Sequence, residues 1–463
     1  MDPNGDDRVK PGDDPVEAGD ATFEIDDEES AVAAGRSGAF VLGIGGCGVR
    51  LVDAIFLRRE GEPRASFTPA ERWDRIATGY AAIDSDLANL ASTRYAAEWV
   101  DDDPEVIGEN YVIGPNSSGE IGEPAADRAV RNRLAEAGSF DEAWGPALRS
   151  EGLRDAASIW VLHGLGNATG SGATPTVVRA IREELAGAER TPSVEKPIVS
   201  VPVVPDLEEP PTPHPARTAS VLVGLARIAT TASAVIPMGN DRLYGHPHRP
   251  RIDAVDESHP YHEHNETVVE FLETTLSVLQ AAPDAPGGTA LPSMGANLDV
   301  TSLFAPVDAR GASATAPVLA PAVGEVSTIC GAESVEFLLR DALSRGRLIE
   351  FDPAPSSGGL LFFSGPKEEM ESLDQFVYDG TIYGRMRESF DRSSPHLSCT
   401  RTVVSGTDSV RVVVLCWNPR LPLVDELYER AKRHRIADDG PGERLREHWT
   451  EIERLREALA PES

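Results

Sequence analysis

The stretch that decides the fold runs from Ser158 to Leu185 and reads SIWVLHGLGNATGSGATPTVVRAIREEL. Its apolar start predicts a buried strand, and its end has the periodicity of a helix. Between them lies a loop with glycine at 164, 166, 170 and 172. Glycine lets a backbone approach a phosphate closely, and the unpaired N–H groups of a helix start favour negative charge. The stretch predicts an anion-binding loop, with an ordinary glycine-rich turn as the alternative.

A second glycine loop lies near the start of the apolar sequence. The segment Ala39–Phe56 predicts a strand, a turn and a helix, and its Gly43, Gly45 and Gly48 fit the pattern G-x-G-x-x-G. A short apolar segment, Tyr80–Ile83, follows and ends in an Asp-Ser-Asp sequence. Because the carboxyl ends of parallel strands form the ligand crevice of such a sheet, both segments deliver small or polar residues to one place.

Further segments repeat this order of strand, loop and helix. Tyr111–Val130 predicts a strand end, a Gly- and Ser-rich loop and a helix, and Pro197–Pro205 predicts another buried strand. The alternation predicts a right-handed α/β fold with a parallel sheet. One pyrophosphate needs one glycine loop, so two loops suit a triphosphate better than a dinucleotide. The P-loop pattern G-x-x-x-x-G-K-[ST] is absent.

The composition is strongly acidic, with a net charge of −33 over 463 residues. Lysine supplies only Lys10, Lys196, Lys367 and Lys432 of the 43 basic residues. We expect no nucleic-acid partner, and we expect a salt-accumulating, halophilic source, with an ordinary acidic protein as the alternative. No early apolar signal region and no run of 18 apolar residues is present, so we expect a cytoplasmic protein without a membrane span. The four cysteines are scattered and are expected to be small buried thiols.

These motifs resemble those of the tubulin/FtsZ superfamily, including its archaeal FtsZ/CetZ-like members. Gly164–Pro175 resembles the phosphate loop G-x-G-G-G-T-G-[ST]-G-x-x-P, with Asn167 and Ala168 in place of two glycines. Val235–Leu243 resembles I-P-N-D-[KR]-L, with two additional residues, Met238 and Gly239. The resemblance runs from residue 38 to residue 418.

The resemblance implies a site for GTP or GDP with Mg²⁺, and no separate metal site in the protein. The nucleotide-binding residues that it implies are Gly45, Gly46, Cys47, Arg50, Asp84, Ser85, Gly119, Gly164, Gly166, Asn167, Ala168, Thr169, Gly170, Ser171, Glu209, Arg217, Asn240 and Asn265. Among these, Glu209 and Arg217 match the ribose loop, while Asn240 and Asn265 match the residues that contact the guanine base.

The resemblance also implies that subunits assemble head to tail and that one subunit completes the active site of the next. The segment Ala296–Ser302 resembles the N-x-D-x-x-[DE] loop that enters the neighbouring pocket. Asp299 and Asn297 are therefore the candidate catalytic residues, and an Asx turn at Asp299 is the alternative. Ser302 occupies the position of the second acid, and a serine cannot act as a carboxylate base, so we expect weak GTP hydrolysis.

The predicted organisation has five parts. They are a disordered acidic tail (1–37), a parallel-sheet GTP-binding domain (38–262), the long central helix and catalytic-loop region (263–322), a smaller α+β domain (323–420) and a helical tail (421–463). The helical tail is either a packed extension or a partner-binding arm. Five histidines between residues 246 and 264 form either a solvated insertion or a metal site.

The first functional hypothesis is a GTP-binding cytoskeletal GTPase whose filaments serve cell shape or division. Its partners would be copies of itself and other FtsZ/CetZ-like proteins. The alternatives are a regulatory homologue that binds GTP without hydrolysing it, and a Rossmann-type NAD or FAD oxidoreductase. Against the latter, Asp84 comes later than the ribose-binding acid expected about 20 residues after the glycines.

Overall fold

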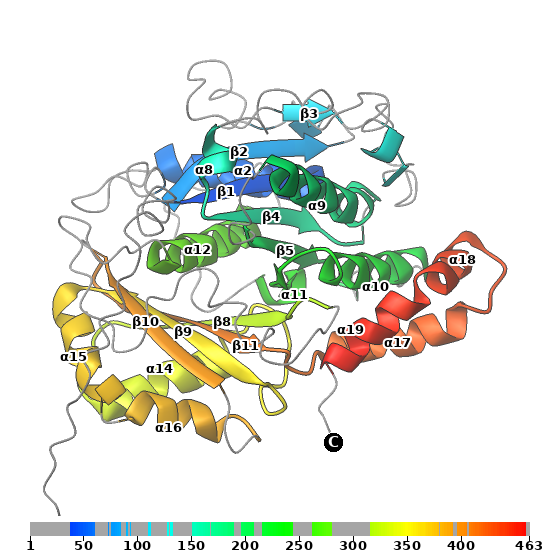
Figure 1. Ribbon diagram of the computed structural model, residues 1–463. Coiled ribbons are helices and arrows are strands. Elements are labelled where there is room, and N and C mark those ends of the chain that lie inside the picture. Colours follow the sequence, from blue (N-terminus) through cyan, green and yellow to red (C-terminus); the bar gives the residue numbers. More distant parts are fainter. Residues whose placement is uncertain are drawn as a thin grey trace, which may run out of the picture. The chain divides into compact units, whose positions relative to one another are not determined.

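The fold is described from a computed structural model (Figure 1). It describes residues 38–60, 73, 76–84, 89–90, 93, 110–112, 127–128, 130–132, 151–166, 168–188, 196–207, 215–243, 262–279, 315–378, 380–391, 396–404 and 407–459. All of them belong to the unit Ser37–Ser463. The predicted acidic tail lies outside these ranges, as do the catalytic-loop region from 280 to 314 and most of the histidine-rich segment.

The first sheet is entirely parallel, with the order β3-β2-β1-β4-β5-β6. A further short strand, β7 (Met238–Gly239), also pairs with β5. The other strands are β1 (Ala39–Ile44), β2 (Ala77–Asp84), β3 (Asn110–Val112), β4 (Ser158–Gly164), β5 (Ile198–Val204) and β6 (Ala234–Val235). Strands β1, β4 and β5 are buried along their whole length, which explains their nearly continuous apolar sequences.

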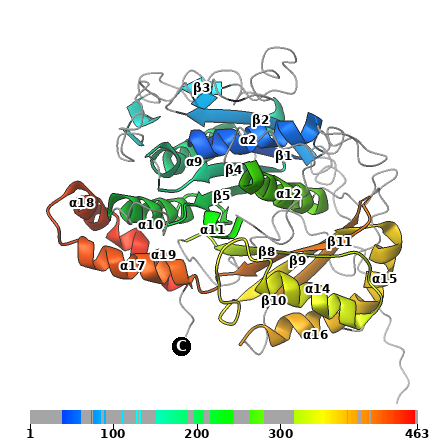
Figure 2. The ribbon, with the colours of Figure 1, turned by 180° about the vertical axis from the view of Figure 1, so that it is seen from behind.

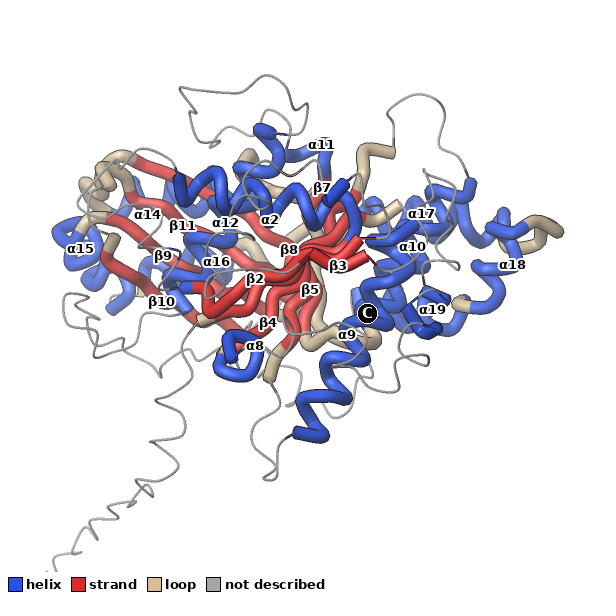
Figure 3. Tube along the Cα trace, turned by 90° about the horizontal axis from the view of Figure 1, so that it is seen from above, coloured by secondary structure: helices blue, strands red, loops and turns tan. Residues whose placement is uncertain are grey.

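Helices cover both faces of this sheet. Helices α2 (Gly45–Glu60) and α12 (His262–Leu279) lie on one face, and α9 (Ala168–Ala188) and α10 (Pro215–Ala229) lie on the other (Figure 3). Alternate side chains of β1 serve the two cores, because successive residues of a strand point to opposite faces. Two short helices, α8 (Glu151–Asp155) and α11 (Asn240–Leu243), also belong to this part of the chain.

The second sheet is mixed and has the order β10-β9-β11-β8. Strands β10 and β9 are parallel, and the other pairs are antiparallel. Its strands are β8 (Leu319–Val326), β9 (Gly358–Gly365), β10 (His396–Val403) and β11 (Val410–Trp417). Helices α14 (Ala332–Ser344) and α15 (Lys367–Tyr378) pack against this sheet, and α16 (Thr381–Glu388) packs against α14 and α15. The predicted α/β domain followed by a smaller α+β fold is thus confirmed.

Helix α12 is the predicted central helix, and it contacts both sheets' elements. It packs against α2 on one side and against β9, β10 and β11 on the other. Its buried Val269, Phe271 and Leu272 share one apolar core with Leu360 and Phe362 of β9. Figure 2 shows α12 between the two sheets from the opposite direction. The helix therefore links the two parts of the fold.

Three helices follow the second sheet: α17 (Pro422–His434), α18 (Gly440–Glu447) and α19 (Trp449–Leu459). All three pack against α10. Their buried Leu427, Leu445 and Leu455 belong to the same apolar core as Val221 and Leu225 of α10. Asp439 caps α18 by accepting a hydrogen bond from the Gly442 N–H at 2.8 Å. The C-terminal segment is thus a packed helical extension.

Some elements differ from the sequence expectations. Strand β2 begins at Ala77 rather than Tyr80, and neither β8, β10 nor α16 was predicted. Strand β8 contains Pro321 and Gly324, which are poor strand formers, and it lies at the edge of its sheet, where proline is tolerated. Strand β8 spans the predicted boundary between the central-helix region (263–322) and the smaller α+β domain (323–420). The domain boundaries remain a prediction. The expectation that all cysteines are buried was wrong, because Cys330 is exposed.

Candidate functional site

The two glycine loops leave neighbouring strands at the point where the strand order reverses. Strands β1 and β4 pair directly, and the chain continues from β1 toward β2 on one side and from β4 toward β5 on the other. Ligands of parallel α/β sheets bind in the crevice that opens at such a reversal, beyond the carboxyl ends of the strands. Helix α2 begins at Gly45 directly after β1, and α9 begins at Ala168 shortly after β4. Both helix starts therefore lie at the carboxyl ends of these strands, and the N–H groups of a first helical turn have no partner within the helix.

The two loops touch each other. Gly45 has a φ of +73°, and a β-carbon added to it would lie 2.9 Å from the Gly170 nitrogen and 3.4 Å from the Thr169 β-carbon. Only glycine satisfies both the left-handed backbone and this close approach. Residues 43–48 and 164–172 are thus close enough to contact a common ligand.

The second loop is joined to the start of α10. Gly166 has a φ of +82°, and a β-carbon there would lie 2.9 Å from Pro205 and 3.3 Å from the Arg217 side chain. The Gly166 N–H donates a hydrogen bond to the buried Ser171 hydroxyl at 2.9 Å. Pro205 follows β5 and Arg217 lies in the first turn of α10, so a third strand end reaches the same crevice.

A fourth strand end is connected through Asn89. The buried Asp84, at the end of β2, accepts a hydrogen bond from the Asn89 amide at 2.8 Å. The same amide nitrogen would lie 2.9 Å from a β-carbon on Gly46. Asn89 was not among the predicted site residues; its position five residues after Asp84, in a helical segment that follows the strand, is the signal that points to it.

Two arginines have buried N–H groups that suit an anionic ligand. Within the part of the chain that the structure describes, the Nε atoms of Arg50 and Arg217 are buried and have no hydrogen-bond partner. A buried donor without a partner is unfavourable by about 1–3 kcal/mol, which a bound oxygen acceptor would remove. Arg50 follows the first glycine loop on α2, and Arg217 lies beside Gly166. The residues present therefore fit a phosphate-bearing nucleotide.

Cys47 and His163 next to the loops are uncharged at neutral pH. Burial raises the pKa of Cys47 to about 12, against a smaller opposing effect of Arg50. Burial also lowers the pKa of His163 to about 4, and its Nε2 lies 2.8 Å from the Ser200 hydroxyl. Neither side chain is thus an anion that would repel phosphate, and Cys47 is not an activated nucleophile.

The residues expected to contact the base lie on two neighbouring helices. Asn240 opens α11 and Asn265 lies in the first turn of α12, and these helices are in contact. Both asparagines are half-buried. The two additional residues, Met238 and Gly239, form β7 and place Asn240 directly after a strand of the first sheet.

Several predicted site residues lie outside the described residues. These are Ser85, Gly119, Asn167, Glu209, Asn297 and Asp299, together with Ser302. Ala168 is described only as the first residue of α9. Most of the other predicted nucleotide-binding residues lie together, either through the contacts given above or through their positions at these strand ends. They are Asp84, Gly45, Gly46, Cys47, Gly164, Gly166, Thr169, Gly170, Ser171 and Arg217, and Arg50 lies one turn further along α2.

A partly buried ion-pair cluster joins α9 and α10. Asp127 accepts hydrogen bonds from the Thr176 hydroxyl of α9 and from Arg227 of α10, the latter at 3.1 Å. Burial opposes its charge, but these bonds and the two nearby arginines, Arg227 and Arg131, lower the pKa of Asp127 overall. Sequence reasoning missed this cluster, since Thr176 and Arg227 lie 49 and 100 residues from Asp127.

Two negative observations concern the described ranges alone. There, no three His, Cys, Asp or Glu side chains form a group that could hold a metal ion. No described helix is long and apolar enough to cross a membrane.

Residues 39–247 match the model of the Tubulin/FtsZ family GTPase domain. Among curated proteins, the chain is 21% identical over 344 residues to the tubulin-like protein CetZ of Thermococcus kodakarensis, covering 73% of this chain and 72% of that one. It is 21% identical to CetZ of Pyrococcus abyssi over 75% of this chain and 78% of that one.

Solved structures show the same fold. The GDP-bound CetZ1 monomer of Haloferax volcanii is similar with a TM-score of 0.59 and 15% identity, covering 86% of this chain and 99% of that one. The GTPγS-bound protofilament of CetZ2 from the same organism gives a TM-score of 0.57 and 17% identity, covering 86% and 98%. An empty FtsZ dimer of M. jannaschii gives 0.52 and 16%, covering 85% and 92%.

Proposed function

We propose, from the premise that this chain belongs to the tubulin/FtsZ superfamily, that it is a cytoskeletal protein that binds GTP or GDP and assembles head to tail into filaments. The observation that supports this most is the contact between Gly45 and Gly170 at the strand-order reversal. It joins two phosphate-type loops around one crevice. The strand order is also that of a Rossmann fold, but one dinucleotide does not need two touching glycine loops.

In this proposal the chain holds the nucleotide mainly by its backbone. The N–H groups at the starts of α2 and α9 bind the phosphates, Arg50 and Arg217 donate from the two sides, and Asn240 and Asn265 contact the base. Mg²⁺, when bound with the nucleotide, offsets the charge that develops on the phosphates. These N–H donors are already in place before the reaction. Preorganised donors of this kind stabilise the charge of a transition state without a rearrangement of the loops.

The proposed hydrolysis requires a neighbouring subunit. Asp299 and Asn297 would enter the nucleotide crevice of the next copy, where Asp299 orients the attacking water. Ser302 in place of a second acid weakens base assistance, so the proposed turnover is slow. The setting that we propose is the cytoplasm of a salt-accumulating cell, with a role in cell shape or division.

The first test is the identity of the nucleotide that copurifies with the protein. Denaturation followed by chromatography should release GDP or GTP; a nicotinamide or a flavin would overturn the proposal and favour an oxidoreductase.

The second test is GTP turnover measured against protein concentration in molar KCl. A site shared by two subunits gives a sigmoid onset, and Asp299→Asn should abolish turnover while nucleotide is retained. The replacement of the second acid by Ser302 favours one other candidate, a regulator that binds GTP and caps relatives without hydrolysis. Retained GTP with no turnover at any concentration would select that candidate.

A further inference from the structure

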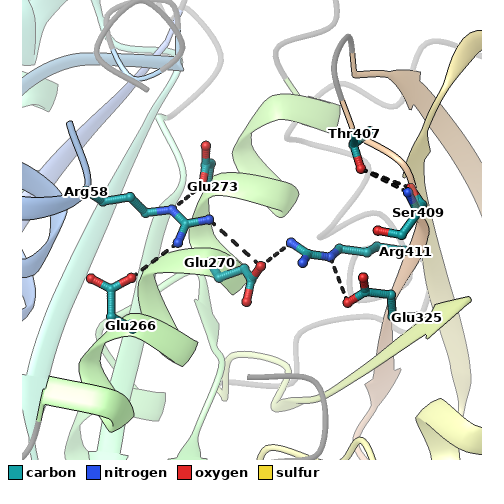
Figure 4. A network of polar contacts seen from close by, with 8 residues as sticks. All are labelled: Arg58, Glu266, Glu270, Glu273, Glu325, Thr407, Ser409 and Arg411. Atoms are coloured by element: carbon teal, nitrogen blue, oxygen red, sulfur yellow. Dashed lines mark hydrogen bonds and ion pairs between the residues drawn. The ribbon is translucent and has the colours of Figure 1, made fainter. Parts of the chain in front are cut away.

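Arg58, in the last turn of α2, contacts three glutamates of α12 (Figure 4). Its Nε lies 2.6 Å from Glu273, its Nη1 3.2 Å from Glu266, and its Nη2 3.8 Å from Glu270. The glutamates are three and four residues apart, so they line one face of the helix. One guanidinium therefore contacts about two turns of α12.

This cluster is largely removed from water. The side chains of Glu266 and Glu273 are 5% exposed, that of Glu270 is 10% exposed, and that of Arg58 is 21% exposed. Burial by itself would lower the pKa of Arg58, but the three carboxylates outweigh it and the pKa is raised. Replacing Arg58 is therefore expected to be unfavourable, because each of these buried carboxylates loses one cationic partner.

A second arginine holds α12 from the other side. Arg411 of β11 pairs with Glu270 and also with Glu325 of β8, the latter at 3.1 Å (Figure 4). Glu270 is thus shared by a cation of the first part of the fold and a cation of the second. Among the described contacts, Arg58 pairs with Glu266 and Arg411 does not. This contact distinguishes the two arginines.

Arg58 connects the two helices that carry parts of the proposed nucleotide site. Helix α2 starts at Gly45 in the first phosphate loop, while Glu266 directly follows Asn265. Apolar residues of both helices, such as Ile55, Phe56 and Val269, share one core. Apolar contacts are not directional, so they alone do not fix the position of α2 along α12. A shift of one residue along α12, about 1.5 Å, would move the three carboxylates out of reach of the Arg58 guanidinium.

We propose that Arg58 is a positioning residue that sets the distance between the phosphate loop of α2 and the base-contacting Asn265 of α12. This inference rests on the proposed GTP site. It makes Arg58 important for recognition of the base and not for recognition of the phosphates, which the loops bind without α12.

The test compares Arg58→Gln with Arg411→Gln in the full-length protein in molar KCl. Each variant removes one cation that contacts Glu270, and only the first loses the contact with Glu266. Titrations with GTP and with inorganic tripolyphosphate, which has no base, give two affinities for each protein. We expect Arg58→Gln to weaken GTP binding by about tenfold and tripolyphosphate binding by less than about threefold. Arg411→Gln should change the ratio of the two affinities by less than about twofold.

Two further variants cover a failure of Arg58→Gln to fold. Arg58→Lys keeps the charge but cannot contact all three glutamates. Its ratio of GTP affinity to tripolyphosphate affinity should lie between those of the native protein and Arg58→Gln. Glu266→Gln removes the charge that pairs with Arg58 beside Asn265, and it should lower the ratio of GTP affinity to tripolyphosphate affinity, as Arg58→Gln does.

The inference is overturned if Arg58→Gln and Glu266→Gln weaken both ligands equally, or if Arg411→Gln changes the ratio as much as they do. A native protein that binds no guanine nucleotide would instead refute the proposed function.

Discussion

Gly45 and Gly170 lie so close that a β-carbon on Gly45 would be 2.9 Å from the Gly170 nitrogen. We predict that Gly45→Ala weakens nucleotide binding by at least about tenfold, because the methyl group separates the loops and strains the backbone at a φ of +73°. Titration with a fluorescent GDP analogue measures the effect. Gly384→Ala in α16 is the matched control, since nothing lies within 4 Å of its β-carbon position; it should leave affinity unchanged. Equal affinities for the native protein and Gly45→Ala would contradict the shared site.

Arg227 and Arg131 both pair with Asp127 but differ in exposure. The Arg227 side chain is 9% exposed and that of Arg131 is 58% exposed. Arg227→Gln should lower the free energy of unfolding by about 1–3 kcal/mol, because it leaves a half-buried carboxylate with fewer donors. Arg131→Gln should lower it by less than about 1 kcal/mol. Denaturant titration at constant salt compares the two, and similar losses would mean that burial of this cluster has no energetic effect.

The buried His163 predicts a pH-dependent stability. Its pKa is about 4 in the folded chain and about 6.5 when unfolded, so between these values the unfolded state binds more protons. The His163 contribution is complete above pH 6.5 and is lost as pH falls toward 4. We expect the native protein to lose about 2 kcal/mol between pH 7.5 and pH 5 relative to His163→Gln. Parallel stability curves for the two proteins would show that His163 is not buried in its neutral form.

The packing of the C-terminal helices can be tested with one buried residue, Leu455, and one exposed residue, Ile436. Leu455 is fully buried against the core that includes α10, while Ile436 is 81% exposed. Leu455→Ala should destabilise the protein by about 2–5 kcal/mol, and Ile436→Ala by less than about 0.5 kcal/mol. Thermal unfolding in molar KCl measures both. A small effect of Leu455→Ala would indicate that the helices detach from α10 in solution.

Ser302→Asp supplies the acid that the resembled catalytic motif has at this position. If the proposed interfacial hydrolysis is correct, the second carboxylate should raise turnover by about tenfold or more, since general-base assistance is commonly worth more than that. Phosphate release above the assembly concentration measures the change. Ser302→Asn is the control of similar size without the charge, and an increase shared by both variants would exclude an effect of the carboxylate.

The parts of the fold that could be predicted from the sequence are those with local signals. The apolar runs of β1, β4 and β5 and the glycines at 43–48 and 164–172 predicted the parallel sheet and its loops, and the structure brings these loops into contact. The family resemblance added Asn240 and Asn265, which lie on touching helices. Their roles in binding, like those of Asp299 and Asn297, remain predictions.

The features that the sequence did not reveal depend on contacts between distant residues. Arg58 lies 208 residues from Glu266, and nothing near either residue distinguishes them from solvent-exposed charges of an acidic protein. Asn89 acquires its place only because β2 lies beside β1. Strand β8 escaped detection because Pro321 and Gly324 interrupt its apolar pattern, which its position at the sheet edge allows.

The packing of α17, α18 and α19 on α10 has a consequence for how the protein is made. Residues 215–229 emerge from the ribosome long before residues 422–459, which cover them in the finished molecule. Domains generally fold as units during synthesis, yet here the part of the fold that contains the first sheet keeps an uncovered apolar face of α10 until residues 422–459 have been synthesised. A nascent chain stalled at residue 421 should therefore present a binding surface for chaperones that the full-length protein lacks.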